Sequence, residues 1–158
     1  MVEGWLGMVT EDAAVGDPLA LEHQVCFALA VASRNVISLY RPLLEPMGLT
    51  HPQYLVMLAL WQHSPLSVKE LSRLLQLDPG TLSPLLKRLE AGGLINRGRA
   101  ERDERVLEVT LTAAGRELRR EAEKIPAAVF ERLNMPMDEL LQLHAALTRV
   151  IAITSTAS

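Results

Sequence analysis

Residues Ser67–Thr112 read SVKELSRLLQLDPGTLSPLLKRLEAGGLINRGRAERDERVLEVTLT, and the order of signals in this stretch indicates the architecture of the chain. The opening SVKE is a capping box, and the later Asp78-Pro79 pair is typical of a second helix start. A Gly-Gly pair ends that second helix. Two apolar runs then flank a charged tip, ERDER, and indicate a two-stranded hairpin. Two short helices followed by such a hairpin predict a winged helix-turn-helix.

The flanking sequence predicts further helices. Apolar residues recur at three- and four-residue spacings from Pro18 to about Leu44, which is typical of a long amphipathic helix. Thr-His-Pro-Gln at 50–53 is another capping box. The expected helices are 18–44, 51–63, 67–75, 79–91, 113–133 and 136–153, and the expected strands are 94–95 and 106–111, joined through 97–105.

The fold class is therefore mainly α, within α+β, with a winged helix-turn-helix over about residues 50–112. Residues 1–17 lack periodicity and are expected to form a loose arm, and residues 18–158 a single domain. The helices at about 18–45 and 113–153 carry apolar faces with no evident partner in a small winged domain. Because a second copy would cover these faces, we expect a homodimer built from both ends of the chain.

Composition narrows the class of protein. The chain has 158 residues, 49% hydrophobic and 22% charged, as expected for one soluble domain. It has no apolar run near the roughly 20 residues of a membrane span and no secretory signal, so the cytoplasm is the expected location. The one cysteine, Cys26, excludes an intrachain disulfide and a multi-cysteine metal site. We expect no cofactor and no metal.

Charge is distributed unevenly along the chain, whose net charge is −3. Residues 67–105 contain eight Lys or Arg and six Asp or Glu, a local charge of +2, whereas the remainder carries −5. A basic module within an acidic body is typical of a protein that meets phosphate with one surface only.

The second helix and the hairpin tip supply the candidate DNA contacts. Hydroxyls near the helix start can bond base edges or phosphates, and cations one to two turns later can neutralise the backbone. The hairpin arginines suit a narrow minor groove, with the intervening aspartate orienting one of them. The candidates are Thr81, Ser83, Lys87, Arg88, Arg102, Asp103 and Arg105. The alternatives are ordinary helix-start chemistry for the hydroxyls and a solvated face for Lys87 and Arg88.

Asp103-Glu104-Arg105 ahead of Leu111-Thr112 resembles the wing of the MarR family of dimeric winged-helix regulators. QVCFALAVASRNVISLYRPLLEPMGLTHPQYLVMLALW and LDPGTLSPLLKRLEAGGL are similar to its organic-hydroperoxide-sensing subgroup, the OhrR-type repressors, over about residues 20–120. The resemblance implies a transcriptional repressor, with double-stranded DNA at a pseudo-palindromic operator and an organic hydroperoxide as its partners.

A lone cysteine on an apolar helix stripe is ordinarily a small core residue. The resemblance instead implies that Cys26 is the peroxidatic thiol, whose thiolate becomes a sulfenic acid. In the subgroup, tyrosines largely from the partner subunit support that thiolate, and Tyr40 stands at one of their positions. His51 stands where the subgroup usually has tyrosine, and Ala30 where relatives have a further aromatic residue. A histidine can donate a hydrogen bond and can add charge on protonation, although it can also merely occupy the first turn of its helix.

With no second cysteine, a small cellular thiol or overoxidation is the expected next step after the sulfenic acid, followed by release of the operator. Three alternatives remain open. The chain can be a repressor released by a non-covalent lipophilic or phenolic ligand, a thiol peroxidase, or a winged-helix interaction module that never reads DNA. Turnover lacks further support because His23, His63 and His144 form no convincing metal cluster, so we expect no enzyme.

Overall fold

The structure is a computed structural model that describes residues 17–155. The arm expected over residues 1–17 therefore lies, apart from Asp17, outside the described residues. The α-helices are α2 (Val25–Leu44), α3 (His51–His63), α4 (Val68–Leu75), α5 (Pro79–Ala91), α6 (Ala113–Ala122), α7 (Ile125–Leu133) and α8 (Met137–Ser155), and the 3-10 helices are η1 (Leu21–His23) and η2 (Glu45–Met47). The strands β1 (Leu66–Ser67), β2 (Ile95–Ala100) and β3 (Asp103–Leu111) form one antiparallel sheet in the order β1-β3-β2.

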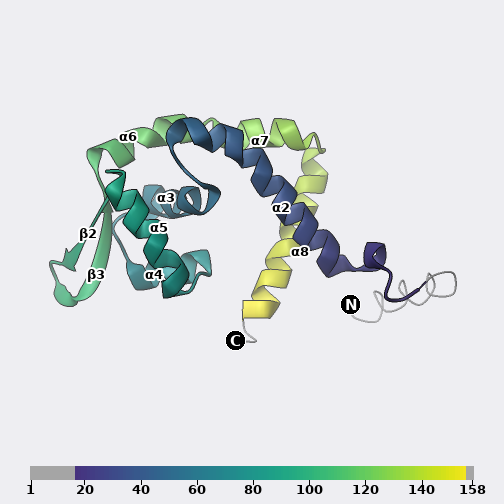
Figure 1. The fold of residues 1–158 in the computed structure, drawn as a ribbon, viewed down its shortest axis with the longest axis horizontal. Coiled ribbons are helices and arrows are strands. Elements are labelled where there is room, and N and C mark those ends of the chain that lie inside the picture. The colour runs from purple at the N-terminus through teal and green to yellow at the C-terminus, as the bar shows by residue number, and fades with distance from the viewer. Residues whose placement is uncertain (1–16, 156–158) are drawn as a thin grey trace.

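Helices α3, α4 and α5 and the sheet form a winged lobe, residues 50–112, at one end of the molecule (Figure 1). Local capping sets the three helix starts, as the sequence predicts. The side chains of Thr50 and Ser67 each accept a hydrogen bond within a complete capping box, and Asp78 caps α5 by accepting from Thr81. The winged helix-turn-helix and the mainly helical fold class are therefore confirmed.

The predicted strand bounds were wrong. Residues expected to connect the hairpin belong to its strands, which meet in a two-residue turn at Glu101-Arg102. The sequence prediction followed apolar runs, but a two-stranded ribbon that projects into solvent keeps its backbone pairing where its side chains are charged. The short strand β1 was also not predicted, and it pairs Leu66 with Val109 of β3.

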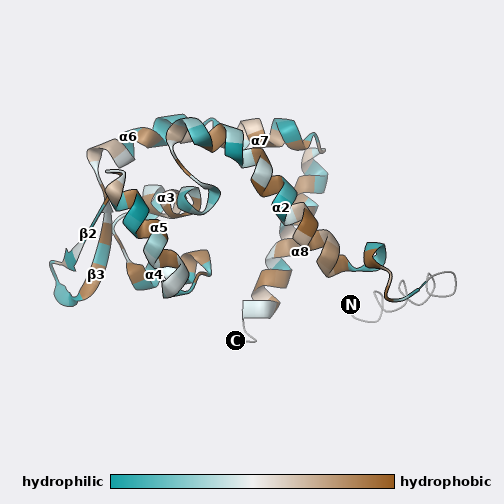
Figure 2. Ribbon diagram, in the orientation of Figure 1, coloured by the Kyte–Doolittle hydropathy of each residue, from teal (hydrophilic) through white to brown (hydrophobic). Residues whose placement is uncertain are grey.

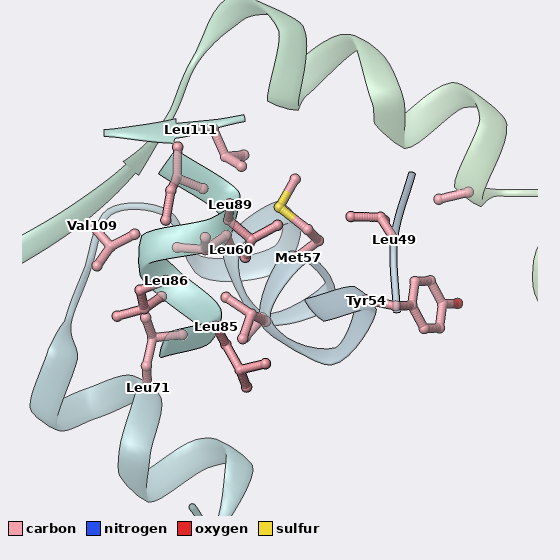
Figure 3. Close-up of a cluster of buried hydrophobic side chains, with 14 of the residues drawn as sticks. Leu49, Tyr54, Met57, Leu60, Leu71, Leu85, Leu86, Leu89, Val109 and Leu111 are labelled. Atoms are coloured by element: carbon pink, nitrogen blue, oxygen red, sulfur yellow. The ribbon is translucent and has the colours of Figure 1, made fainter. Parts of the chain in front are cut away.

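The core of the lobe is formed by leucines from three helices and apolar residues from the sheet (Figure 3). Leu60 of α3, Leu71 of α4 and Leu86 of α5 are 0–1% exposed and meet Val109 of β3 in one cluster. Each fully buried leucine contributes roughly 1.5–3 kcal/mol relative to exposure, so this cluster holds α5 against the sheet.

The terminal helices differ from the lobe because most of their apolar residues are exposed in a single chain. Leu44 is the one buried residue of α2, and α8 has none. Figure 2 shows hydrophobic residues along both helices, which extend away from the lobe. The exposed apolar side chains include Phe27, Leu29, Ile37, Leu141, Leu143, Val150 and Ile151.

Two of the expected terminal helices had wrong bounds. The first begins at Val25 rather than near Pro18, because the Gln24 side chain folds back and donates to the carbonyl oxygens of Pro18 and Ala20. The helix expected over 113–133 is divided after Ala122. Pro126 in the first turn of α7 has no N–H to donate to an oxygen of the preceding turn, so the regular hydrogen bonding is interrupted there.

A closely packed junction of hydrogen bonds and backbone contacts attaches α6 to the winged lobe. Thr112 donates its hydroxyl to the Gly93 carbonyl oxygen at 2.6 Å, and its N–H to that of Leu94 at 3.1 Å. The indole N–H of Trp61 on α3 donates to the Gly115 carbonyl oxygen at 2.8 Å. Gly115 itself lies against the Leu94 backbone so closely that a Cβ atom would overlap the Leu94 oxygen. Glycine is required here for close approach rather than for its backbone angles.

We predict that Gly115→Ala lowers the free energy of unfolding by about 1–3 kcal/mol, because the clash is with backbone and no side chain can move aside. Urea unfolding followed by circular dichroism measures the change. Gly98→Ala is the matched control, since nothing lies within 4 Å of a Cβ there, and it should be neutral or stabilising. Equal midpoints for the two variants would contradict this account of the junction.

Candidate functional site

The first candidate surface is the outer face of α5. Leu82, Leu85, Leu86 and Leu89 bury one side of this helix in the lobe. The four residues predicted from the sequence are all exposed, with Thr81 and Arg88 along one flank of α5 and Ser83 and Lys87 along the other. The structure therefore brings the two hydroxyls and two cations of this helix to one solvent-facing surface.

Thr81 has a capping role as well as an exposed position. Its N–H and its hydroxyl donate to the Asp78 carboxylate, both at 2.9 Å. These two hydrogen bonds, the backbone one first, hold the pKa of Asp78 below its ordinary value. Because the hydroxyl hydrogen is committed to the cap, the Thr81 oxygen faces solvent as an acceptor.

The wing carries its charges at the hairpin tip. Arg102 lies exposed in the turn, and Asp103 begins β3. The Asp103 carboxylate accepts from the backbone N–H of Arg105 at 3.0 Å and from its guanidinium Nε at 3.3 Å. The Arg105 side chain is 93% exposed, so this contact holds an otherwise free arginine near the wing backbone.

Sequence reasoning missed an ion pair that ties the wing to α5. Glu90 accepts from the Arg97 backbone N–H and guanidinium, both at 3.0 Å, and these bonds, the side-chain one first, lower the pKa of Glu90. The Arg97 side chain is 23% exposed. Arg97 therefore positions the wing against α5 and is not a free cation for DNA. In the sequence, the positive charge of Arg97 did not distinguish this positioning role from a contact with DNA.

A second candidate site is an aromatic cluster where α2 meets α3. The ring centroids of Tyr40 and His51 are 4.8 Å apart in an edge-on arrangement, and Tyr54 lies 5.8 Å from Tyr40 and 6.4 Å from His51. Burial lowers the pKa of His51 and raises the pKa of Tyr40. Burial, and then the charge of Tyr40, raises the pKa of Tyr54. His51 is thus held toward its neutral form.

Tyr54 was not predicted as a site residue. It follows His51 by three positions, so both lie on one face of α3, and that spacing within Thr-His-Pro-Gln-Tyr was the signal available in the sequence. An open hollow of about 430 Å³ lies beside the cluster. It is lined by the end of α2, by η2 and by the first turn of α3. We call it the His51 hollow, and its lining includes Ile37, Arg41, Glu45, Leu49, His51 and Pro52.

Cys26 does not meet this cluster within one chain. It lies exposed in the first turn of α2, fourteen residues before Tyr40 on the same continuous helix. At 1.5 Å per residue, the helix separates the two by about 21 Å. A site that contains Cys26, Tyr40 and His51 therefore needs Cys26 from one copy and the rings from another.

The described part of the chain offers little else for chemistry. Within residues 17–155, no three His, Cys, Asp or Glu side chains lie close enough together to hold a metal ion. In the same range, no helix is both long and apolar enough to cross a membrane.

Comparison with known proteins identifies a family and several relatives of this chain. The family model described as MarR family matches residues 49–107. The organic hydroperoxide resistance transcriptional regulator of Bacillus subtilis is 44% identical over 131 residues, which cover 83% of this chain and 89% of that protein. Reduced AbfR bound to DNA is similar with a TM-score of 0.69 and 34% identity, covering 85% of this chain and 94% of that one. Overoxidised AbfR bound to DNA gives 0.65 and 34%, covering 83% and 95%. The chain belongs to the MarR family.

Proposed function

We propose that this protein is a DNA-binding repressor that senses organic hydroperoxides through Cys26 and releases its operator on oxidation. The observation that carries the proposal combines two features. The polar faces of α5 and the wing are exposed, and Cys26 is exposed but too far from Tyr40 to form one site with it in a single chain. The 44% identity to a hydroperoxide resistance regulator supports the same function. A DNA-binding role and a lone thiol fit the cytoplasm as its location.

The proposed active form is a homodimer. The apolar residues of α2 and α8 are exposed in a single chain, and a second copy would bury them. Each Å² of apolar surface removed from water would stabilise the dimer by roughly 25 cal/mol. In this arrangement the helices at about 18–45 and 113–153 form the dimerisation region of a single domain. A two-fold dimer presents two α5 helices, so its operator is a pseudo-palindrome with one half-site for each.

In the proposed dimer, Cys26 of one copy faces Tyr40 and His51 of the other. The thiolate attacks the terminal oxygen of the hydroperoxide, the S–O bond forms and the O–O bond breaks. The sulfur is oxidised to a sulfenic acid, and the departing alkoxide takes up a proton and leaves as the alcohol. Tyr40 and His51 serve as hydrogen-bond donors that favour the thiolate.

The next step uses a low-molecular-weight thiol or a second peroxide, since the chain has one cysteine. A mixed disulfide adds bulk, and a sulfinic acid adds charge, beside the cluster that joins α2 to α3. Either change displaces the winged lobe relative to its partner, and the two α5 helices then no longer match two half-sites.

The DNA contacts lead to the first functional prediction. Arg105→Ala and Lys87→Ala should each weaken binding to the DNA upstream of the chain's own gene by about tenfold, and should flatten the salt dependence, because fewer counterions are released. Gel shifts at several salt concentrations measure both effects. Arg120→Ala on α6, where the arginine pairs with Glu117, is the charge-matched control and should bind like the wild type. Salt-independent binding would contradict DNA as the partner.

The thiol chemistry leads to the second functional prediction. An organic hydroperoxide should lower the operator affinity of the wild type by tenfold or more, on the order expected for an allosteric coupling. Cys26→Ser should bind the operator equally before and after treatment. Because overoxidised AbfR has been observed on DNA, the sulfenic acid, the mixed disulfide and the overoxidised forms are to be separated and identified by mass. Equal response in Cys26→Ser would indicate a non-covalent ligand, and steady peroxide consumption without operator binding would indicate a peroxidase.

His51 leads to the third. Its lowered pKa keeps the imidazole neutral near pH 7, and on acidification it gains a charge that stabilises a facing thiolate. The oxidation rate of Cys26 should therefore fall less steeply between about pH 7 and pH 5 in the wild type than in His51→Phe. Stopped-flow loss of thiol measures the profile. His51→Gln, which keeps a neutral donor, should follow His51→Phe in slope, and parallel profiles for all three would exclude a tuning role.

A further inference from the structure

The His51 hollow contains a cation that the proposed sensor does not use. Ile37, Leu49 and Pro52 provide apolar lining, and Arg41 lines the same space, one residue after Tyr40. Arg41 follows Ile37 by four positions, so the two share one face of α2. The hollow thus combines an apolar surface, a positive group and His51, next to the place where the proposed chemistry occurs.

Arg41 is exposed, and within residues 17–155 its guanidinium makes no ion pair and no hydrogen bond. Glu45 is the other formally charged side chain in the hollow, one turn further along, yet the two are not within ion-pairing distance. An unpaired arginine beside apolar lining suits a ligand with an apolar body and an anionic group, because the guanidinium fits a carboxylate with two parallel hydrogen bonds.

We propose that the His51 hollow receives the organic part of the hydroperoxide and that Arg41 selects peroxides that carry a carboxylate. The inference rests on the proposed function, because it takes the thiol of the partner copy to lie beside His51. The carboxylate lies at Arg41, the hydrocarbon covers Ile37, Leu49 and Pro52, and the peroxide group reaches His51 and the thiolate. The bonds made and broken are those of the sensor reaction, and the carboxylate is unchanged.

The test compares two probes that differ only at the carboxylate, a hydroperoxide of linoleic acid and its methyl ester, both below their micelle concentrations. The rate constant for Cys26 oxidation in the full-length reduced protein is measured for each by thiol loss and intact mass. We expect the wild type to favour the acid by about two- to fivefold, the range for one exposed ion pair. The ratio should fall to about one in Arg41→Gln and to an intermediate value in Arg41→Lys, which keeps the charge but loses the second parallel hydrogen bond.

Two variants control for charge. Glu45→Gln removes the opposing charge from the hollow, so the acid-to-ester ratio should rise. Arg120→Gln removes a cation from α6, away from the hollow, and should keep the wild-type ratio. A wild-type ratio near one, or equal falls in Arg41→Gln and Arg120→Gln, would overturn the assignment of Arg41 while leaving the sensor proposal standing. If neither probe oxidises Cys26, the proposed function itself fails.

Discussion

The backbone contact between Gly115 and Leu94 holds α5, the wing and α6 together as one rigid unit. Leu94 lies between the end of α5 and the start of β2, so it is fixed to α5 on one side and to the wing on the other. Thr112, which follows β3 and caps α6, and Trp61 of α3 add hydrogen bonds to the same junction. A shift of α6 therefore cannot be absorbed locally and has to carry α5 and the wing with it.

The aromatic cluster lies where the lobe meets its other support. Tyr40 belongs to the last turns of α2, and His51 and Tyr54 open α3, which is packed into the lobe core. The lobe is thus held at two places, through α6 at the Gly115 junction and through η2 and α3 at the cluster. In the proposed mechanism, a change in packing at the cluster with the junction intact would rotate the lobe rather than loosen it. This arrangement supports coupling of a thiol beside His51 to the spacing of two α5 helices.

The parts of the fold that depend on local chemistry were predictable from the sequence. Thr50, Ser67 and Asp78 set helix starts through side-chain bonds within three residues, so the bounds of α3, α4 and α5 followed directly. The errors and omissions arose where side-chain bonds reach further along the chain than one helical turn. The Gln24 side chain that precedes α2 bonds to residues four and six positions back, and the Glu90–Arg97 pair that fixes the wing joins residues seven positions apart across a turn of the chain. For the thiol site, the residues came from the resemblance, which already implied tyrosines from a partner subunit, and the length of α2 agrees with this by separating Cys26 from Tyr40 within one chain.

The Glu90–Arg97 and Asp103–Arg105 pairs also change what the local charge of the winged segment means. The formal charge of +2 over residues 67–105 counts every arginine as if it were available to phosphate. However, Arg97 is paired with Glu90, and Arg105 is paired with Asp103. Within residues 17–155, the other six cations of this segment make no ion pair, and they are Lys69, Arg73, Lys87, Arg88, Arg99 and Arg102. In the proposed dimer, DNA contacts through these cations would be salt-sensitive, and two lobes at a fixed spacing would add their contacts in a single association. On the proposed mechanism, a lobe rotation that cost one half-site would lose most of the affinity, so a modest change beside the thiol would suffice to release DNA.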